Sequence, residues 1–409
     1  RRARAASPDA HICFYGLYAG LNARYLLGQE SPGDSAKGTA SSRPIADSVI
    51  AGEVEAPLAA LARALAEGRP PEDVPGVSTR VESTAAAAPG YLARLDFPVP
   101  DRQGLPSLDN YARFMHEGRA VPAGYVEASR GCLHTCRHCP VVPVYGGRFF
   151  VAPVETVMAD VRQQVAAGAC HITFGDPDFL NGPGHALKVA RALHAEFPGV
   201  TFDFTTKVEH ILERAELFPQ FRRLGAAFVV SAFEAVDDAI LAHLHKGHTA
   251  ADMARALDIL RAAELPVQPT WLPFTPWTTL DGYIELLSWI RARGLIPHVP
   301  AVQLSIRLLI PPGSALLEEH AAAGWLGPLD AGNFSYRWEH PDPRVDALQA
   351  RVAALAERAS DDSPYTTFRA VEQLAHEAAG RAAPVWQPPA DSAGRLAVRP
   401  PRLTEDWFC

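Results

Sequence analysis

Three cysteines lie close together, at Cys132, Cys136 and Cys139, in the spacing Cys-x3-Cys-x2-Cys. Thiolates are soft ligands suited to iron–sulfur clusters, and three on one loop can bind three irons of a [4Fe–4S] cubane. The fourth iron then has no protein ligand and stays open to a small molecule. Zinc is the alternative, because either His134 or His138 could supply the fourth ligand that zinc usually takes. The spacing therefore predicts a metal centre, with the iron–sulfur cluster as the preferred interpretation.

Strands and helices alternate regularly around and after the cysteine motif. Segments such as VETVMADVRQQVAAG and TAADMARALDILRAAEL carry apolar residues at helical spacing. Six such units predict an α/β fold with a parallel, partial (β/α)6 barrel, in which the cysteine loop follows the first strand. The expected strands are 124–129, 170–175, 200–206, 226–233, 266–272 and 302–309.

The sequence before the barrel contains two strand–helix units. The first opens at His11, and the second has a strand at 48–51 and a helix at 55–66. Two such units predict a small Rossmann-like domain. The sequence after the barrel has helical patterns over 344–380 and then an extended, Pro-rich tail. The expected divisions are a Rossmann-like domain at 1–95, a linker at 96–123, the barrel at 124–320, and a C-terminal helical extension with its tail at 321–409.

Composition narrows the classes of function. The net charge is −8 and the chain has no basic block, which argues against nucleic-acid binding. No apolar run approaches the roughly 20 residues that span a bilayer, and no signal peptide is apparent at the N-terminus. Half of the six cysteines fall in one motif, which indicates a metal site and not a disulfide framework. We expect a cytoplasmic protein that contacts neither membrane nor nucleic acid.

The strings EASRGCLHTCRHCPVVPVYGGRFF and HITFGDPDFLNG, within the alternating strands of 124–318, resemble the radical S-adenosylmethionine (SAM) superfamily. That family places this loop after the first strand of a partial barrel, and its open iron binds SAM and cleaves it reductively. The resemblance implies a [4Fe–4S] cluster, SAM, a small-molecule substrate and an electron donor such as flavodoxin or ferredoxin. The family usually has an aromatic residue before the third cysteine. Here His138 stands there, a planar ring that can stack on adenine.

The same resemblance suggests SAM-binding residues on other strands. Gly175, Asp176 and Asp178 fill the segment that binds the SAM amino group in the family, unless they form an ordinary Asp-Pro loop. Ser231 and Glu234 fill the segment that reaches the ribose hydroxyls.

Three further residues carry chemistry with alternatives left open. Lys207 pairs either with the SAM carboxylate or with Glu209. Arg307 lies in an apolar strand, where a charge must be paired, so it holds a carboxylate of substrate or SAM or makes a structural salt bridge. Cys409 follows TEDWF at the end of the sequence and is either a reactive, ligand-binding thiol or an incidental terminus.

Several strings together resemble a narrower family, the radical SAM proteins with a CUAEP/CCAEP tail. They are LDFPVPDRQGLPSLDNYARF, GYVEASRGCLHTCRHCPVVPVYGGRF, HITFGDPDFLNGPGHA, TKVEHIL and the ending LTEDWFC. A related resemblance is to the radical SAM enzyme of arsinothricin biosynthesis. It implies transfer of a 3-amino-3-carboxypropyl group to arsenite, with Cys409 as a thiol for this thiophilic atom. We therefore expect an enzyme, a transferase that modifies a small molecule, with Cys409 and Arg307 as candidate catalytic residues.

Two rival functions remain. Residues 10–95 resemble a shortened cobalamin-binding domain, which would make the chain a cobalamin-dependent radical SAM methyltransferase. The usual Asp-x-His-x-x-Gly motif is incomplete, because Asp9 and His11 are present but Gly16 lies too far on. Cobalamin is therefore possible but not the favoured cofactor. The second rival is an iron–sulfur sensor or binding protein without catalysis.

Overall fold

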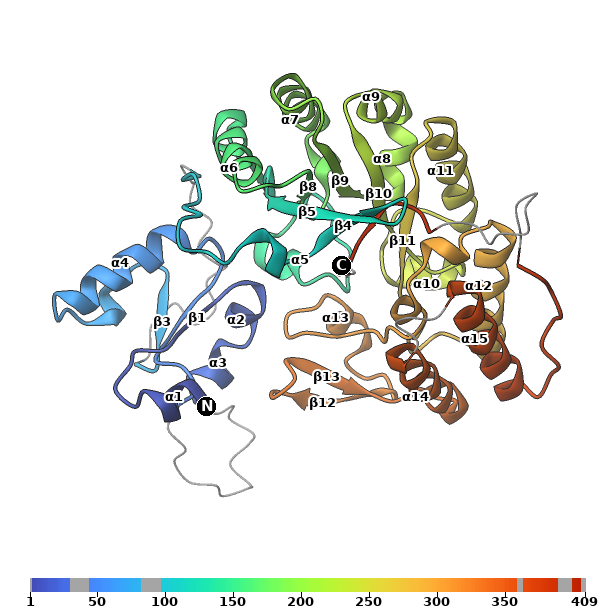
Figure 1. The fold of residues 1–409 in the computed structure, drawn as a ribbon. Coiled ribbons are helices and arrows are strands. Elements are labelled where there is room, and N and C mark those ends of the chain that lie inside the picture. Colours follow the sequence, from blue (N-terminus) through green and yellow to red (C-terminus); the bar gives the residue numbers. More distant parts are fainter. Residues whose placement is uncertain (1, 30–43, 82–96, 359–362, 389–398, 406–409) are drawn as a thin grey trace. The chain divides into compact units, whose positions relative to one another are not determined.

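A computed structural model describes residues 2–29, 44–81, 97–358, 363–388 and 399–405. The chain forms two compact units, whose segments can be followed in Figure 1. The N-terminal unit comprises residues 1–96, 131–148 and 309–338, and the sheet unit comprises residues 97–130, 149–308 and 339–409. The cysteine motif thus belongs to the N-terminal unit, whereas the strands expected for the barrel belong to the sheet unit.

One seven-stranded sheet organises the sheet unit. Its strands are β4 (Arg113–His116), β5 (Arg119–Val126), β8 (His171–Phe174), β9 (Thr201–Thr206), β10 (Ala226–Glu234), β11 (Val267–Trp271) and β14 (Arg402–Leu403). They lie in the order β11-β10-β9-β8-β5-β4-β14. β5, β8, β9, β10 and β11 are parallel, whereas β4 and β14 extend the sheet as antiparallel strands. The predicted α/β fold with a partial barrel is confirmed.

Helices connect the parallel strands, as the sequence periodicity predicts. They are α6 (Val154–Ala166), α7 (Pro183–Glu196), α8 (Val208–Glu213), α9 (Phe218–Arg223), α10 (Asp238–His243), α11 (Ala250–Ala262) and α12 (Leu280–Ala292), with α14 (Pro343–Arg358) and α15 (Pro364–Ala378) toward the C-terminus. Short 3₁₀ turns are η2 (Leu108–Asn110), η3 (Phe179–Asn181), η4 (Ala215–Leu217), η5 (Ile296–His298) and η6 (Ala301–Leu304). A capping box between Thr249 and Asp252 begins α11.

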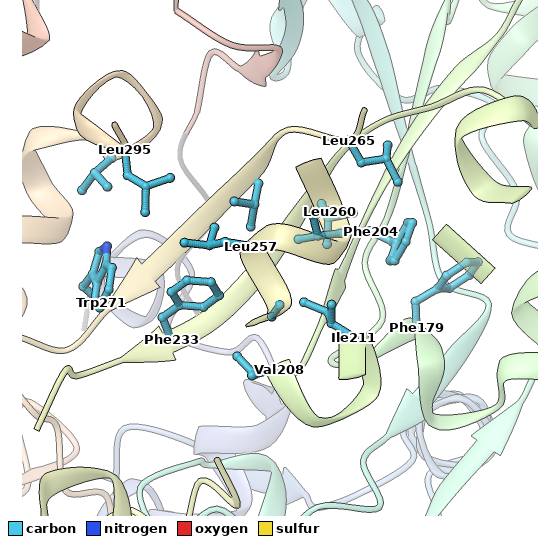
Figure 2. Close-up of a cluster of buried hydrophobic side chains, with 14 of the residues drawn as sticks. Phe179, Phe204, Val208, Ile211, Phe233, Leu257, Leu260, Leu265, Trp271 and Leu295 are labelled. Atoms are coloured by element: carbon cyan, nitrogen blue, oxygen red, sulfur yellow. The ribbon is translucent and has the colours of Figure 1, made fainter. Parts of the chain in front are cut away.

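The main core lies between the sheet and these helices. Figure 2 shows part of it, with Phe204, Phe233 and Trp271 from strands beside Leu257 and Leu260 from α11. Burying one such side chain contributes about 1.5–3 kcal/mol to folding. This face of the sheet therefore fixes the strands, and their carboxyl ends are held in place for a site.

The opposite face of the sheet carries a buried polar network. His171 contacts Asp203 and Thr201 through its two ring nitrogens, each at 2.7 Å, and the Thr173 hydroxyl donates to Asp203 at 2.7 Å. Phe114 of β4 stacks on the His171 ring with centroids 3.9 Å apart. Because residues alternate along a strand, these side chains point away from the helix-covered core.

The sixth expected strand, 302–309, does not form. Residues Ala301–Leu304 make η6, and only Arg307 makes a bridge, to Phe274. The Gln303 side chain accepts a hydrogen bond from Trp271 N at 2.8 Å and so takes the place of a strand partner. Pro300 sets the turn before this segment, which explains why the apolar alternation misled the prediction.

The N-terminal unit contains its own small sheet. Its elements are α1 (Arg2–Ala6), β1 (Cys13–Tyr15), α2 (Leu17–Leu21), α3 (Ala23–Leu26), β2 (Ser48–Ile50), α4 (Glu55–Ala66), η1 (Pro71–Asp73), β3 (Val77–Thr79), α5 (Val141–Tyr145), α13 (Leu316–His320), β12 (Leu326–Asp330) and β13 (Ser335–Trp338). β1 and β2 are parallel and β3 is antiparallel to β2. The expected helix at 55–66 is α4.

The chain leaves and re-enters the sheet unit at a short pair of strands, β6 (Ser129–Gly131) and β7 (Phe149–Val151). Across the residues that the structure describes, every helix is too short or too polar to cross a lipid bilayer.

Candidate functional site

The cysteine loop is closed at its base by backbone contacts. Cys132 N donates to Arg148 O at 3.1 Å, and Gly131 has a φ of 78°. A Cβ on Gly131 would lie 2.4 Å from Arg148 O, so only glycine fits where the loop begins. Cys136 is buried, whereas Cys132 and Cys139 are half-buried. The loop therefore holds three thiols in a short, closed segment.

The donor set of the loop suits an iron–sulfur cluster. Three thiols lie within one short segment, and thiolates are the soft ligands that such clusters take. Three thiolates would bind three irons of a cubane and leave one iron open. His138, the expected adenine contact, is half-buried in this loop.

Asp176 is held at the carboxyl end of β8. It is fully buried and accepts hydrogen bonds from Ala128 N, at 3.0 Å, and from the Ser129 hydroxyl. Burial raises the pKa of Asp176 to about 7, although both hydrogen bonds oppose that rise. Its neighbour Gly175 lies against the Tyr125 ring, whose hydroxyl donates to Gly175 O at 3.2 Å.

Asp178 holds the next turn together. It accepts from Leu180 N and Thr206 Oγ1 at 3.0 Å each, from Lys207 N at 3.3 Å and from His210 Nδ1 at 2.9 Å. Burial alone would lower the pKa of His210, but Asp178 outweighs that effect and the pKa is raised. Asp178 thus joins the loop after β8 to the end of β9 and the start of α8.

The expected cationic residues have partners in the sheet unit. Lys207 forms an ion pair with Glu209, which is one of the two alternatives expected from the sequence. Arg307 pairs with Asp346 of α14, and Asp346 also accepts from His340 N at 2.9 Å. The structure therefore contains the salt-bridge alternative for both residues.

Ser231 and Glu234 both lie on β10 but in different settings. Ser231 shares the face of Val229 and Phe233, which belong to the helix-covered core, and its buried hydroxyl makes no hydrogen bond within the described chain. Glu234 has a φ of 66° and pairs with buried Lys246 at 3.1 Å. β10 therefore presents the Glu234 carboxylate at its carboxyl end, whereas Ser231 faces the core.

Sequence reasoning missed several polar residues of this region. Tyr125, Thr173 and Asp203 lie on strands for which the sequence predicts only a place in the barrel, and His210 on α8 is not among the predicted site residues. A signal exists for Thr173 and Asp203, because a polar residue buried within a strand needs a partner. Cys409 lies outside the described residues.

Residues 126–287 match the family model described as the Radical SAM superfamily. This match confirms the superfamily predicted from the cysteine motif, and with it the prediction of an enzyme domain.

Two curated relatives cover part of the chain. The hopanoid C-3 methylase of Methylococcus capsulatus is 28% identical over 231 residues, which are 55% of this chain and 43% of that protein. An uncharacterized methyltransferase of Pyrococcus horikoshii is 25% identical over 210 residues, which are 50% of this chain and 44% of that protein. The chain thus spans less than half the length of these relatives.

Among solved structures, the radical SAM methyltransferase TsrM from Kitasatospora setae, with cobalamin and a [4Fe–4S] cluster bound, has a TM-score of 0.63. The alignment covers 91% of this chain and 82% of that one at 16% identity. At such identity the likeness shows the fold alone.

Proposed function

Because residues 126–287 are a radical SAM domain, we propose that this chain is a methyltransferase that cleaves SAM at a [4Fe–4S] cluster and uses cobalamin. One observation carries the proposal: a loop that backbone hydrogen bonds close at its base bears three thiols within eight residues, Cys132, Cys136 and Cys139. Such a loop leaves one iron for SAM. Two relatives named as a methylase and a methyltransferase support the choice of methyl transfer.

Residues at the carboxyl ends of the strands are the proposed SAM contacts in the sheet unit. Backbone atoms at Gly175 and the carboxylate of Asp176 suit an ammonium group, since a buried acceptor gains from a charged donor. Asp178 supports this turn through its four internal hydrogen bonds. Glu234, paired with Lys246, is the proposed ribose contact on β10.

The small sheet of the N-terminal unit suits a flat cofactor without a histidine ligand. Tyr15 and Tyr18 are 58% and 37% exposed at the carboxyl end of β1, the end at which parallel sheets bind ligands. Burial, and after it the negative charge of the Cys139 thiolate, raise the pKa of Tyr18, so this edge lies near the cysteine loop of the same unit. His11 precedes β1 and contacts Ser48 at 2.8 Å, at the opposite end of the strand.

The positions of Tyr15, Tyr18 and His11 indicate how this unit would hold cobalamin. The corrinoid face would lie against Tyr15 and Tyr18, and His11 would not ligate cobalt. Cobalamin, when bound, would supply a carrier for the methyl group. The likeness of the fold to TsrM, a structure with cobalamin bound, supports the choice of cobalamin as the cofactor.

Product analysis tests the reaction. The anaerobically purified chain, reconstituted with iron and sulfide, is incubated with SAM, cobalamin and dithionite, and SAM-derived products are measured by mass spectrometry. Methyl transfer predicts S-adenosylhomocysteine, with or without 5′-deoxyadenosine, and loss of both products in Cys136→Ala. No SAM cleavage in the reconstituted enzyme would contradict the proposal.

The same assay addresses the alternative expected from the sequence. Aminocarboxypropyl transfer to arsenite would produce 5′-methylthioadenosine instead, and addition of arsenite should increase it. The arsenite alternative depends on Cys409, which lies outside the described residues. This alternative and the narrower CUAEP/CCAEP family both stay predictions.

Cobalamin binding is tested separately by its visible spectrum. Hydroxocobalamin should remain with the protein after gel filtration, and Tyr18→Ala should weaken its retention. EPR of the Co(II) form should lack nitrogen splitting from the protein, and His11→Ala should bind as the unaltered chain does. Nitrogen splitting that disappears in His11→Ala would overturn the ligand assignment.

A further inference from the structure

A cavity of about 540 Å³ lies beside β5 in the sheet unit. Its walls are mostly apolar and come from the segment before β4, from β5 and from β14. They include Leu105, Leu108, Tyr111, Ala112, Ala123 and Leu403. Cavities of a few hundred to about 1,000 Å³ with such walls hold small molecules.

The edge of β5 beside this cavity is already satisfied. β4 pairs with Arg119–Pro122 only, which leaves the later residues of β5 without a neighbouring strand on that side. Gln164 fills the gap: its side-chain oxygen accepts from Tyr125 N and its amide donates to Tyr125 O, both at 2.9 Å. The edge of β5 at this cavity therefore has no unpaired backbone groups at Tyr125 with which an added peptide strand could bond.

The inner end of the cavity is polar. Thr173 lines it and donates its hydroxyl hydrogen to Asp203, so it presents an acceptor to a ligand. Tyr125 also lines it and reaches Gly175 O with its hydroxyl. Tyr125 thus brings the cavity next to the carboxyl end of β8, where we place the SAM amino group.

The charge of the cavity favours a neutral ligand. Arg102 contributes to the wall, but it is bound to Asp160 by two hydrogen bonds of 2.7 and 2.8 Å. A guanidinium held in this way is neutralised by its carboxylate partner. Glu405 stands in the lining as an exposed carboxylate and would repel an anion.

We propose that this cavity binds the substrate of the enzyme, a neutral, largely apolar small molecule with a hydroxyl or amine that donates to Thr173. The inference rests on the proposed function and adds the class of substrate to it.

Binding of N-phenyl-1-naphthylamine, a fluorescent apolar amine, tests the site without any catalysis. Leu105 is 52% exposed and lines the cavity, whereas Leu65 is 39% exposed on α4 of the N-terminal unit. Leu105→Glu should weaken binding about tenfold, because a carboxylate would be desolvated against apolar walls. Leu65→Glu should leave it unchanged. Ala112→Trp, which fills the cavity, should also abolish binding, with circular dichroism melts confirming that each variant folds.

The hydrogen-bond donor is tested by competition. 1-Phenylnaphthalene has the same rings without the N–H and should compete about fivefold more weakly, the value of one hydrogen bond. Equal competition would overturn the donor assignment. Unchanged probe affinity in both Leu105→Glu and Ala112→Trp would overturn the site. If Leu105→Glu and Ala112→Trp weaken probe binding as expected but the reconstituted enzyme does not cleave SAM, the binding site stands and the proposed function is wrong.

Discussion

Asp176 and Asp178 are two positions apart, yet the structure surrounds their carboxyl groups in different ways. Asp176 accepts two hydrogen bonds in a fully buried position, and its pKa rises to about 7. Asp178 accepts four, one of them from His210, whose pKa is raised in turn. One carboxyl therefore can carry a proton near neutral pH, whereas the other positions a turn.

The raised pKa of Asp176 predicts a pH dependence of folding. The folded chain keeps this proton up to about pH 7, whereas the unfolded chain loses it near the ordinary aspartate pKa of 3.8. The free energy of unfolding should therefore fall as pH rises between about 4.5 and 6.5, by up to about 1.4 kcal/mol per pH unit. Guanidinium titrations should show a flatter dependence for Asp176→Asn. Parallel profiles of the two proteins would refute the assignment.

Asp178→Ala should destabilise the fold strongly. It removes the acceptor of buried Leu180 N, Thr206 Oγ1 and Lys207 N, and each orphaned buried donor costs about 1–3 kcal/mol. We expect denaturant titrations to show a free energy of unfolding that is lower by at least about 2 kcal/mol. Asp258→Ala is the control, because Asp258 is 73% exposed and contacts Arg261 only at 3.7 Å. Equal effects of the two substitutions would show that the Asp178 network is unimportant.

The sequence predicts which residue types take part in a site more easily than it predicts which residues they contact. The cysteine spacing predicts a metal loop, because the three candidate ligands are neighbours in sequence. Glu209 was named as a partner of Lys207 for the same reason, and the ion pair forms. Arg307 pairs with Asp346, which lies 39 positions away on α14, and no local pattern pointed to it.

At the scale of elements, β8 ends in a close contact that only glycine permits. A Cβ on Gly175 would fall 1.9 Å from the Tyr125 ring, so Gly175→Ala must displace that ring or the strand end. We expect Gly175→Ala to lower the free energy of unfolding by about 1–3 kcal/mol, the usual cost of overpacking. Gly184→Ala in α7, where a Cβ meets nothing within 4 Å, should be neutral or stabilising.

A double-substitution cycle isolates the contact at Gly175. In Tyr125→Ala the space is open, so adding Gly175→Ala should then cost much less than it does alone. An equal cost in both backgrounds would place the strain elsewhere in the loop after β8.

Elements with strong local patterns were predicted well, and those set by distant contacts were not. The helix at 55–66 and the strand at 201–206 follow from apolar spacing. The strand at 302–309 failed because Gln303 satisfies β11 with its side chain. The sequence predicts only an extended tail where β14 forms. Leu403 pairs with Phe114, which is far away in sequence, so no local pattern indicates this strand.

β14 should contribute to the stability of the sheet unit. Leu403 is buried with Phe114 and Phe228 in a small cluster on the polar side of the sheet. Leu403→Ala should lower the free energy of unfolding by about 2–3 kcal/mol. Val385→Ala, at a fully exposed valine, should change nothing measurable. Thermal melts that coincide for the two variants would mean that β14 is dispensable.

At the scale of the whole molecule, segments far apart in sequence build the N-terminal unit. The Tyr145 hydroxyl donates to Glu53 at 2.8 Å, which joins the end of α5 to the small sheet. The Ser314 hydroxyl donates to Arg137 O at 2.8 Å, and Arg137 pairs with Glu319 at 2.6 Å. The cysteine loop is thus tied both to the first 96 residues and to residues 309–338, a grouping that no sequence boundary suggested.

This grouping predicts how cluster loading spreads through the chain. Ligation orders the loop that supplies the thiolates, so segments bonded to that loop should become more stable with it. Hydrogen exchange should therefore slow in residues 131–148, at α2 and at α13 when the cluster is reconstituted, and should not change in α11. Cys136→Ala carried through the same reconstitution should show none of this protection. Protection confined to residues 131–148 would mean that the N-terminal unit does not respond as one body, and that the hydrogen bonds of Tyr145 and Ser314 do not couple the loop to its supports.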